Sequence, residues 1–222
     1  MSEKARQARP VNRHQQEFNW SPFTTPGFGG KLEEVPAIWP TNIIHYRIDE
    51  NFSENEKHLI RHAFHEFHEK TNVRFQPHTF QKDYVYIRHG PSACFADLGY
   101  LGGKQEVELS SRCVNQHGRI CHELMHSLGF DHEQCRTDRD EFVNINWNNI
   151  SRGYEDQFAM RNCLAEFLPY DYHSVMHYNA AAFAIDPGIP TIIPRDKTAI
   201  RRIGQRVKIS KTDCFKINTI YT

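Results

Sequence analysis

The chain has 222 residues, of which 27 are basic and 27 acidic, so its formal net charge is zero. That length is enough for one domain with a buried core, and the balanced charge gives no reason to expect binding to nucleic acid or to an anionic membrane. Hydrophobic residues make up 39% of the chain, and no apolar run is long enough to cross a bilayer, so we expect a globular protein without a membrane span.

The N-terminal segment, residues 1–37, is predicted to be an extended or disordered leader. It is rich in Arg, Gln, Pro and Gly and has neither helical nor strand periodicity. Residues 1–20 are polar from the start and lack the apolar centre of a signal peptide.

The first regular elements are predicted directly after the leader. Residues 42–48, NIIHYRI, concentrate the β-branched and aromatic side chains typical of a strand. Ser53 and Glu56 form a capping box for a helix over residues 53–70, whose apolar residues recur on one face. Histidines on the opposite face are interpreted as a solvated surface rather than as metal ligands. They are His58, His62, His65 and His68.

Further strands are predicted over three segments, residues 73–78, 83–89 and 105–110. A glycine-containing loop, residues 90–103, is expected before the last of them. In that last strand Glu106 and Glu108 alternate with apolar residues, which indicates a strand with one face in water.

The next helix, predicted from Gln116 to Gly129, carries the strongest functional signal of the chain. Residues four apart lie on one face of a helix, so His122 and His126 can offer two imidazoles to one ion. Gly129 tolerates the positive φ that ends the helix, and the chain can then return His132 as a third ligand. Residues 130–210 show no long helical periodicity and are predicted to be irregular.

Three nitrogen ligands leave one tetrahedral position open, as in a catalytic rather than a structural zinc site. Glu123 follows the first histidine and is well placed to accept a proton from a water molecule. The alternative is an exposed helix whose histidines have this spacing by chance. It is favoured for a bare pair of histidines four apart, but not for the full H-E-x-x-H-x-x-G-x-x-H pattern of residues 122–132. We therefore predict one catalytic zinc ion per chain.

The extended pattern is that of the metzincin metalloproteases, and the chain resembles the astacin family. The resemblance rests on HELMHSLGFDHEQCRTDRD at 122–140, SVMHY at 174–178 and IGQRVKISKTD at 203–213. It covers about residues 38–222, leaving residues 1–37 as the leader or pro-segment. It implies an α+β fold of two lobes: an upper mixed β-sheet with two helices, and a loop-rich lower lobe that ends in a C-terminal helix.

The resemblance also implies roles for individual residues. Three are zinc ligands: His122, His126 and His132. Glu123 is the general base and acid, and Met176 forms the floor beneath the metal. Tyr178 matches a phenol that leaves the zinc and donates a hydrogen bond to the developing oxyanion. Glu133 is expected to pair with the N-terminus that is freed when a pro-segment is removed. The RTDRD string at 136–140 is expected to form structural ion pairs.

The cysteines match the family only in part. Cys94 and Cys113 correspond to the family's disulfide before the active-site helix, and we expect that bridge. The family's second bridge has no counterpart, because Asn72 occupies the position of one cysteine and the C-terminus lacks the other. The remaining four cysteines allow three pairings or none. They are Cys121, Cys135, Cys163 and Cys214.

The leader departs from the family as well. The string GFGGK, residues 27–31, has Lys31 where the family's inhibitory motif has a zinc-binding aspartate. Latency would then depend on obstruction of the cleft, or on Glu33 or Glu34 reaching the zinc.

The function implied is that of a secreted zinc endopeptidase that hydrolyses internal bonds of protein or peptide substrates. A substrate is expected to add a strand along the edge strand near residues 105–110. One alternative is a catalytically impaired zinc-binding module of the same fold, which would most simply lack Glu123 or Tyr178. Another is a disulfide-framed interaction module with an incidental metal.

Overall fold

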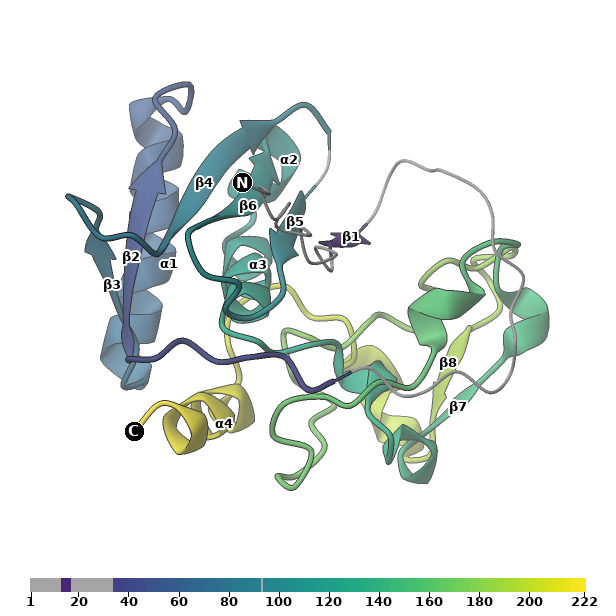
Figure 1. The fold of residues 1–222 in the computed structure, drawn as a ribbon. Helices are drawn as coiled ribbons and strands as arrows, with labels where there is room; N and C mark the ends of the chain where they lie inside the picture. The colour runs from purple at the N-terminus through teal and green to yellow at the C-terminus, as the bar shows by residue number, and fades with distance from the viewer. Residues whose placement is uncertain (1–12, 17–33, 93) are drawn as a thin grey trace, which may run out of the picture.

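Two lobes lie side by side in the computed structural model, which describes residues 13–16, 34–92 and 94–222 (Figure 1). The upper lobe, residues 34–130, contains a mixed β-sheet with its helices, and the lower lobe, residues 131–222, is mostly irregular. The α+β architecture predicted from the sequence is therefore confirmed. Lys31 and Glu33 lie outside the described residues.

The sheet of the upper lobe has six strands in the order β1-β5-β6-β4-β2-β3. The strands are β1 (Arg13–Gln16), β2 (Ile43–Ile48), β3 (Arg74–Pro77), β4 (Tyr84–Gly90), β5 (Cys94–Asp97) and β6 (Lys104–Ser110). Strands β3, β2, β4 and β6 run parallel, whereas β5 is antiparallel to β6 and β1 is antiparallel to β5. The sheet is thus mixed, and its outermost strand on one side comes from the leader segment.

Strand β5 lies within the segment that the sequence predicted as a loop. Its residues are all buried, so it shows no alternation of polar and apolar positions by which a four-residue strand can be recognised. Because β5 pairs with β6, the latter is an internal strand and not the edge expected for substrate binding. The predicted wet face of β6 is also wrong at Glu108, which is only 4% exposed and forms an ion pair with Arg88 of β4.

Helix α1 (Glu54–Lys70) packs its apolar face against the sheet. Its start confirms the predicted capping box: Glu56 N–H donates to Ser53 Oγ at 3.3 Å, and Ser53 N–H donates to Glu56 Oε2 at 2.9 Å. Three of the four histidines on the outer face are exposed, as predicted. The exception is His68, which is half-buried because its Nε2 accepts a hydrogen bond from the Phe75 N–H at 2.8 Å.

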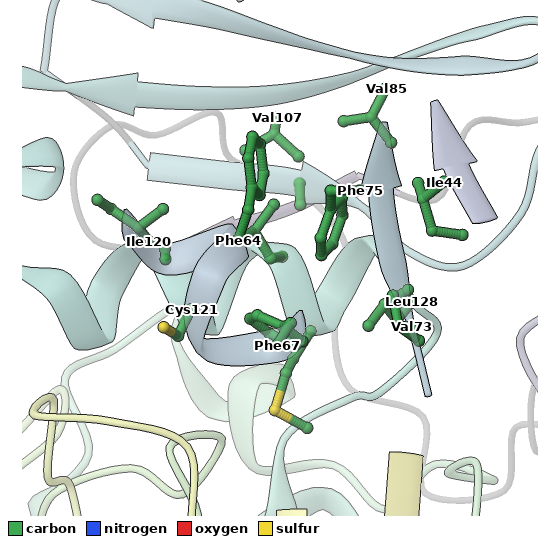
Figure 2. Packing of buried hydrophobic residues seen from close by; sticks show 14 of the residues in the cluster. Ile44, Phe64, Phe67, Val73, Phe75, Val85, Val107, Ile120, Cys121 and Leu128 are labelled. Carbon is green, nitrogen blue, oxygen red and sulfur yellow. The ribbon is translucent and has the colours of Figure 1, made fainter. Parts of the chain in front are cut away.

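The main hydrophobic core lies between the sheet, α1 and α3 (His117–Ser127). Figure 2 shows side chains from these elements converging, with the rings of Phe64 and Phe75 stacked at a centroid distance of 4.6 Å. Each large apolar side chain buried here contributes about 1.5–3 kcal/mol relative to an exposed one. This core therefore holds the active-site helix firmly against the sheet.

The lower lobe has little regular structure. Its elements are η1 (Glu133–Cys135), η2 (Arg139–Glu141), β7 (Val143–Ile145), η3 (Trp147–Asn149), η4 (Glu155–Phe158), β8 (Ile192–Pro194), η5 (Lys197–Arg201) and α4 (Lys211–Ile220). Strands β7 and β8 pair antiparallel. A second, smaller core lies here, formed by Val143, Ile150, Phe158, Tyr178, Ile192 and Ile203. Helix α4 closes the lobe and returns to the upper core through Ile217 and Tyr221.

Hydrogen bonds replace the disulfide that Asn72 prevents. The Asn72 side chain donates to Tyr221 O at 3.0 Å, and the Asn72 backbone N–H donates to Asn218 Oδ1 at 2.7 Å. The same two segments, the end of α1 and the C-terminus, are thus tied together without a covalent bond.

The predicted bridge between Cys94 and Cys113 is present, and it joins β5 to the short helix α2 (Ser111–Val114). The other four cysteines, Cys121, Cys135, Cys163 and Cys214, are free thiols. No helix in the described ranges is long and apolar enough to span a membrane.

Candidate active site

The predicted histidines converge at the boundary between the lobes. His122 and His126 lie on consecutive turns of α3, and His132 follows the helix. Nε2 of His126 is 3.2 Å from that of His122 and 3.1 Å from that of His132. All three side chains are at most 2% exposed. The structure therefore brings together the three residues that the sequence singled out.

Backbone carbonyls determine the tautomers of the first two histidines. His122 Nδ1 is 2.8 Å from Val175 O and His126 Nδ1 is 2.9 Å from Phe130 O. A carbonyl only accepts hydrogen bonds, so each Nδ1 carries the proton and each Nε2 presents a lone pair. Such orientation of the far ring nitrogen is typical of metal-binding histidines.

Electrostatics favour a neutral imidazole at His122. Burial lowers the pKa of His122 well below its ordinary value, and the nearby Arg206, His126 and His132 lower it further. Ligand atoms in a tetrahedral zinc site with bonds of about 2.0–2.1 Å lie about 3.3 Å apart. Nε2 of His126 lies at that spacing from Nε2 of both other histidines, the three ligand atoms lie within 4.8 Å of one another, and with His122 and His126 presenting lone pairs the set fits a divalent cation. These histidines form a candidate metal site.

Gly129 ends the helix as predicted and permits the return of His132. Its φ is +98°, a conformation that side chains with a Cβ rarely adopt. Its N–H donates to His126 O at 2.8 Å, and the next N–H, of Phe130, donates to Met125 O at 3.1 Å. These bonds satisfy the last carbonyls of the helix while the chain reverses.

Glu123 and Tyr178 flank the histidines from different lobes. Glu123 follows His122 on α3 and is 3% exposed. Tyr178 is 4% exposed, and its ring lies 4.5 Å from that of His132 between centroids. The Tyr178 hydroxyl donates to Gln157 Oε1 at 3.3 Å, which holds the phenol beside the third histidine.

The segment around Met176 supports two of the histidines through its backbone. Val175 O orients His122, and Met176 O accepts the N–H of Glu133, the residue after His132, at 3.2 Å. Met176 itself is buried, with 1% of its side chain exposed.

Glu133 forms an ion pair with a lysine of this chain. The family resemblance had led us to expect a freed N-terminus as its partner. Lys216 of α4 places Nζ 2.7 and 2.8 Å from the two carboxylate oxygens. Arg136 Nη1 donates to the same carboxylate at 3.1 Å, and the Asp171 N–H donates at 2.8 Å. Both Glu133 and Lys216 are nearly fully buried. The carboxylate is therefore paired without a new N-terminus, and contact with one stays a prediction.

The RTDRD string forms the predicted structural ion pairs. Arg136 contacts Asp138 at 2.7 Å, and Arg139 contacts Asp140 at 2.6 Å. Arg139 also donates to the carbonyls of Gln134 and Phe158, so this segment is held by its arginines.

Two residues of α4 that support the site were missed from the sequence. Asp213 accepts hydrogen bonds from Ser174 Oγ at 2.6 Å and from the Val175 N–H at 3.0 Å, and Lys216 binds Glu133. Ser210 and Asp213 form a capping box, which was the available signal for the start of α4. Periodicity within one helix does not indicate which distant segment its polar residues contact.

Comparisons with known proteins agree with this geometry. Residues 31–222 match the family model described as Astacin, a family of peptidases. The chain is 41% identical over 197 residues to the zinc metalloproteinase nas-4 of Caenorhabditis elegans, covering 86% of this chain and 61% of the relative. It is 42% identical over 190 residues to nas-14 of the same organism, covering 83% of this chain and 37% of the relative. The chain thus spans less than two thirds of the length of these relatives.

Solved structures share the fold. The high choriolytic enzyme 1 of Oryzias latipes, a hatching enzyme zinc-protease, superposes with a TM-score of 0.78 at 36% identity, covering 83% of this chain and 94% of that chain. Myroilysin superposes with a TM-score of 0.59 at 16% identity, covering 83% of this chain and 95% of that chain, which is a likeness of fold alone.

Proposed function

Because the chain belongs to the astacin family, we propose that it is a zinc-dependent endopeptidase that hydrolyses internal bonds of protein or peptide substrates. The observation that carries the proposal is the convergence of three imidazole nitrogens, with Nε2 of His126 within 3.2 Å of the other two and Glu123 next to the first histidine in sequence. We assign one zinc ion per chain to His122, His126 and His132, with a fourth position left for substrate or water.

The zinc ion would supply Lewis acidity that polarises a carbonyl group and lowers the pKa of a water molecule to about 7. Glu123 would accept the proton of the attacking water and deliver it to the leaving amine. Tyr178 would donate its hydroxyl hydrogen to the carbonyl oxygen as negative charge develops there. Burial of both side chains strengthens these interactions, because little water competes for them.

A peptide substrate would bind at the outer edge of β5 rather than at β6. In the structure this edge is paired with β1, in the register Arg13↔Asp97 to Gln16↔Cys94. We propose that residues 1–37 are a regulatory leader and that residues 38–222 are the peptidase domain. Strand β1 of the leader and an added substrate strand would then compete for the outer edge of β5. Glu34 is exposed and remains a candidate for contact with the zinc.

We also propose an extracellular location, where a bridge such as Cys94–Cys113 forms and persists. The rival interpretation as an impaired zinc-binding module gains no support, since Glu123 and Tyr178 are both present beside the histidines.

The test is proteolysis of casein by the full chain, before and after zinc is removed with 1,10-phenanthroline. Activity should disappear with the metal and return when Zn²⁺ is added back. Full activity of a demonstrably zinc-free sample would contradict the proposal, and a zinc-loaded sample without activity would favour the binding module. An interaction module with an incidental metal would keep its binding after chelation.

A further inference from the structure

A second group of potential metal ligands lies on the other side of the active-site helix. It contains Glu66 from α1 and His117 and Cys121 from the first turns of α3. His117 and Cys121 are four residues apart, so they share one face of the helix and point toward α1. The three ligand atoms lie within 4.8 Å of one another.

The distances within this group match a tetrahedral site with one sulfur ligand. Cys121 Sγ is 3.6 Å from His117 Nε2 and 3.5 Å from Glu66 Oε2. Zinc bonds of about 2.3 Å to sulfur and about 2.0–2.1 Å to nitrogen or oxygen place such atoms about 3.5 Å apart. His117 Nε2 and Glu66 Oε2 are 2.5 Å apart and hydrogen-bonded, so they would separate by somewhat less than 1 Å on binding a cation.

The surroundings also suit a cation. His117 Nδ1 is 3.1 Å from His62 Nδ1, so the nitrogen facing away from the ligand group already has an orienting partner, as in known metal sites. Lys70 Nζ holds the other oxygen of Glu66 at 2.5 Å and fixes the direction of that carboxylate. Glu66 and Cys121 are nearly or fully buried.

An entry path exists. A cavity of about 290 Å³ opens beside the group and is lined by His62, Glu66 and His117 among others. Cys121 is fully buried behind them, and Figure 2 shows its sulfur at the margin of the hydrophobic cluster, directed away from Phe67. An ion entering the cavity would meet the imidazole and the carboxylate first and the sulfur at the bottom.

We propose that Glu66, His117 and Cys121 form a second site, separate from the catalytic histidines, for a divalent cation that accepts sulfur ligands, such as Zn²⁺. The Cys121 thiol loses its proton to solvent, so that the thiolate and the Glu66 carboxylate bring two negative charges to the ion, and the carboxylate keeps its ion pair with Lys70. The proton of His117 moves from Nε2 to Nδ1, where it is donated to Nδ1 of His62, and His62 then carries its own proton on Nε2. A water molecule completes four ligands.

The bound ion would tie α1 to α3 at the residue that precedes His122. In the chain Glu66 is 51 residues from His117 and 55 residues from Cys121. The ion therefore closes a long loop next to the catalytic ligands. Binding to the folded state alone raises the unfolding temperature. With water as its fourth ligand the ion is not enclosed as in a four-ligand structural site, but it would link α1 to the active-site helix, and it does not depend on the proposed peptidase activity.

Cobalt(II) separates this site from the catalytic one, because the catalytic ligands include no sulfur. The full chain is freed of metal and titrated with Co²⁺, while absorption and bound metal are followed. We expect two ions per chain and a thiolate-to-cobalt charge-transfer band in the near ultraviolet. Cys121→Ser should bind one ion and lose the band. His117→Gln should do the same, so the test does not rest on one variant.

Two cysteine variants serve as matched controls. Cys135→Ser removes a thiol that lies near Asp131 and His132, in the only other group of potential metal ligands among the described residues that contains a cysteine. Cys214→Ser removes a free thiol that is half-buried. Both should keep two ions and the band. A single bound ion without the charge-transfer band in the unsubstituted chain would overturn the second site, and so would a band that persists in Cys121→Ser.

Discussion

The two lobes meet at the same three histidines but are stabilised by different interactions. In the upper lobe a continuous apolar core joins α1, α3 and the sheet, and it extends into the lower lobe through Val175, Met176 and Ile217. The lower lobe has a small core of its own, and much of its support near the site comes from buried charges such as Glu133, Lys216 and Asp213. An irregular segment lacks a repeating hydrogen-bond pattern, so side chains must satisfy its backbone groups.

The residues of the site are therefore held in position by different kinds of interaction. His122, His126 and Glu123 lie on a helix held by apolar packing, whereas His132 and Tyr178 lie on irregular segments that hydrogen bonds and ion pairs help to hold in place. Substitutions in the two lobes should therefore have distinguishable consequences.

The largest expected effect is a loss of turnover when Glu123, on the helix of the upper lobe, is replaced. Glu123→Gln should reduce kcat by about 10²–10⁴ or more, since general-base catalysis contributes that much. Zinc content, measured by mass spectrometry of the metal, should stay at the unsubstituted level. Substantial residual proteolysis would contradict the assigned role.

Two substitutions compare stabilisation by a buried ion pair with stabilisation by apolar packing. Lys216→Met should destabilise the protein by about 3–5 kcal/mol, because it leaves the Glu133 carboxylate buried beside fewer positive charges. Phe67→Ala should cost a similar 3–5 kcal/mol by opening a cavity in the upper core. Both are measured by urea denaturation monitored by circular dichroism.

Adding Glu133→Gln should distinguish these two losses. It should restore part of the stability of Lys216→Met, because the unpaired charge is removed as well. It should restore none in Phe67→Ala, whose defect is apolar. Equal behaviour in both backgrounds would show that the lobes do not differ in the way described.

A smaller kinetic effect is expected for the group from the lower lobe. Tyr178→Phe should lower kcat by about 10²-fold with little change in KM, because its hydrogen bond strengthens mainly in the transition state. The comparison is made on one peptide substrate. A change confined to KM would mean that the phenol binds substrate instead.

The smallest effect concerns the junction that lacks a disulfide. Asn72→Ala should lower the free energy of unfolding by about 1–3 kcal/mol through loss of its side-chain hydrogen bond to Tyr221 O. Thermal unfolding measures it. Asn115→Ala is a matched control at an asparagine whose exposed side-chain hydrogen bond, to Ser111 O, involves neither Asn72 nor the C-terminus, with an expected loss of about 1 kcal/mol or less. If the two variants lose the same stability, the Asn72 contact has no special role.

Local patterns sufficed for the elements whose stability depends on neighbours in the sequence. The capping box at Ser53, the apolar stripe of α1 and the glycine stop at Gly129 were all predicted, and each involves residues within a few positions of one another. The spacing of His122, His126 and His132 likewise placed three candidate ligands together, because helix geometry relates two of them and a short turn the third.

Only the tertiary structure decided which segments became neighbours. Strand β5 formed because β6 offered it a partner, and that pairing moved the sheet edge away from β6 and buried Glu108. Lys216 reached Glu133 across 83 positions of sequence. The sequence alone thus determined helices α1 and α3, the turn after α3 and the spacing of the histidines, since these follow from backbone geometry over short distances. Strand order and the partners of buried charges depended on the packing of distant segments, which short-range periodicity does not encode.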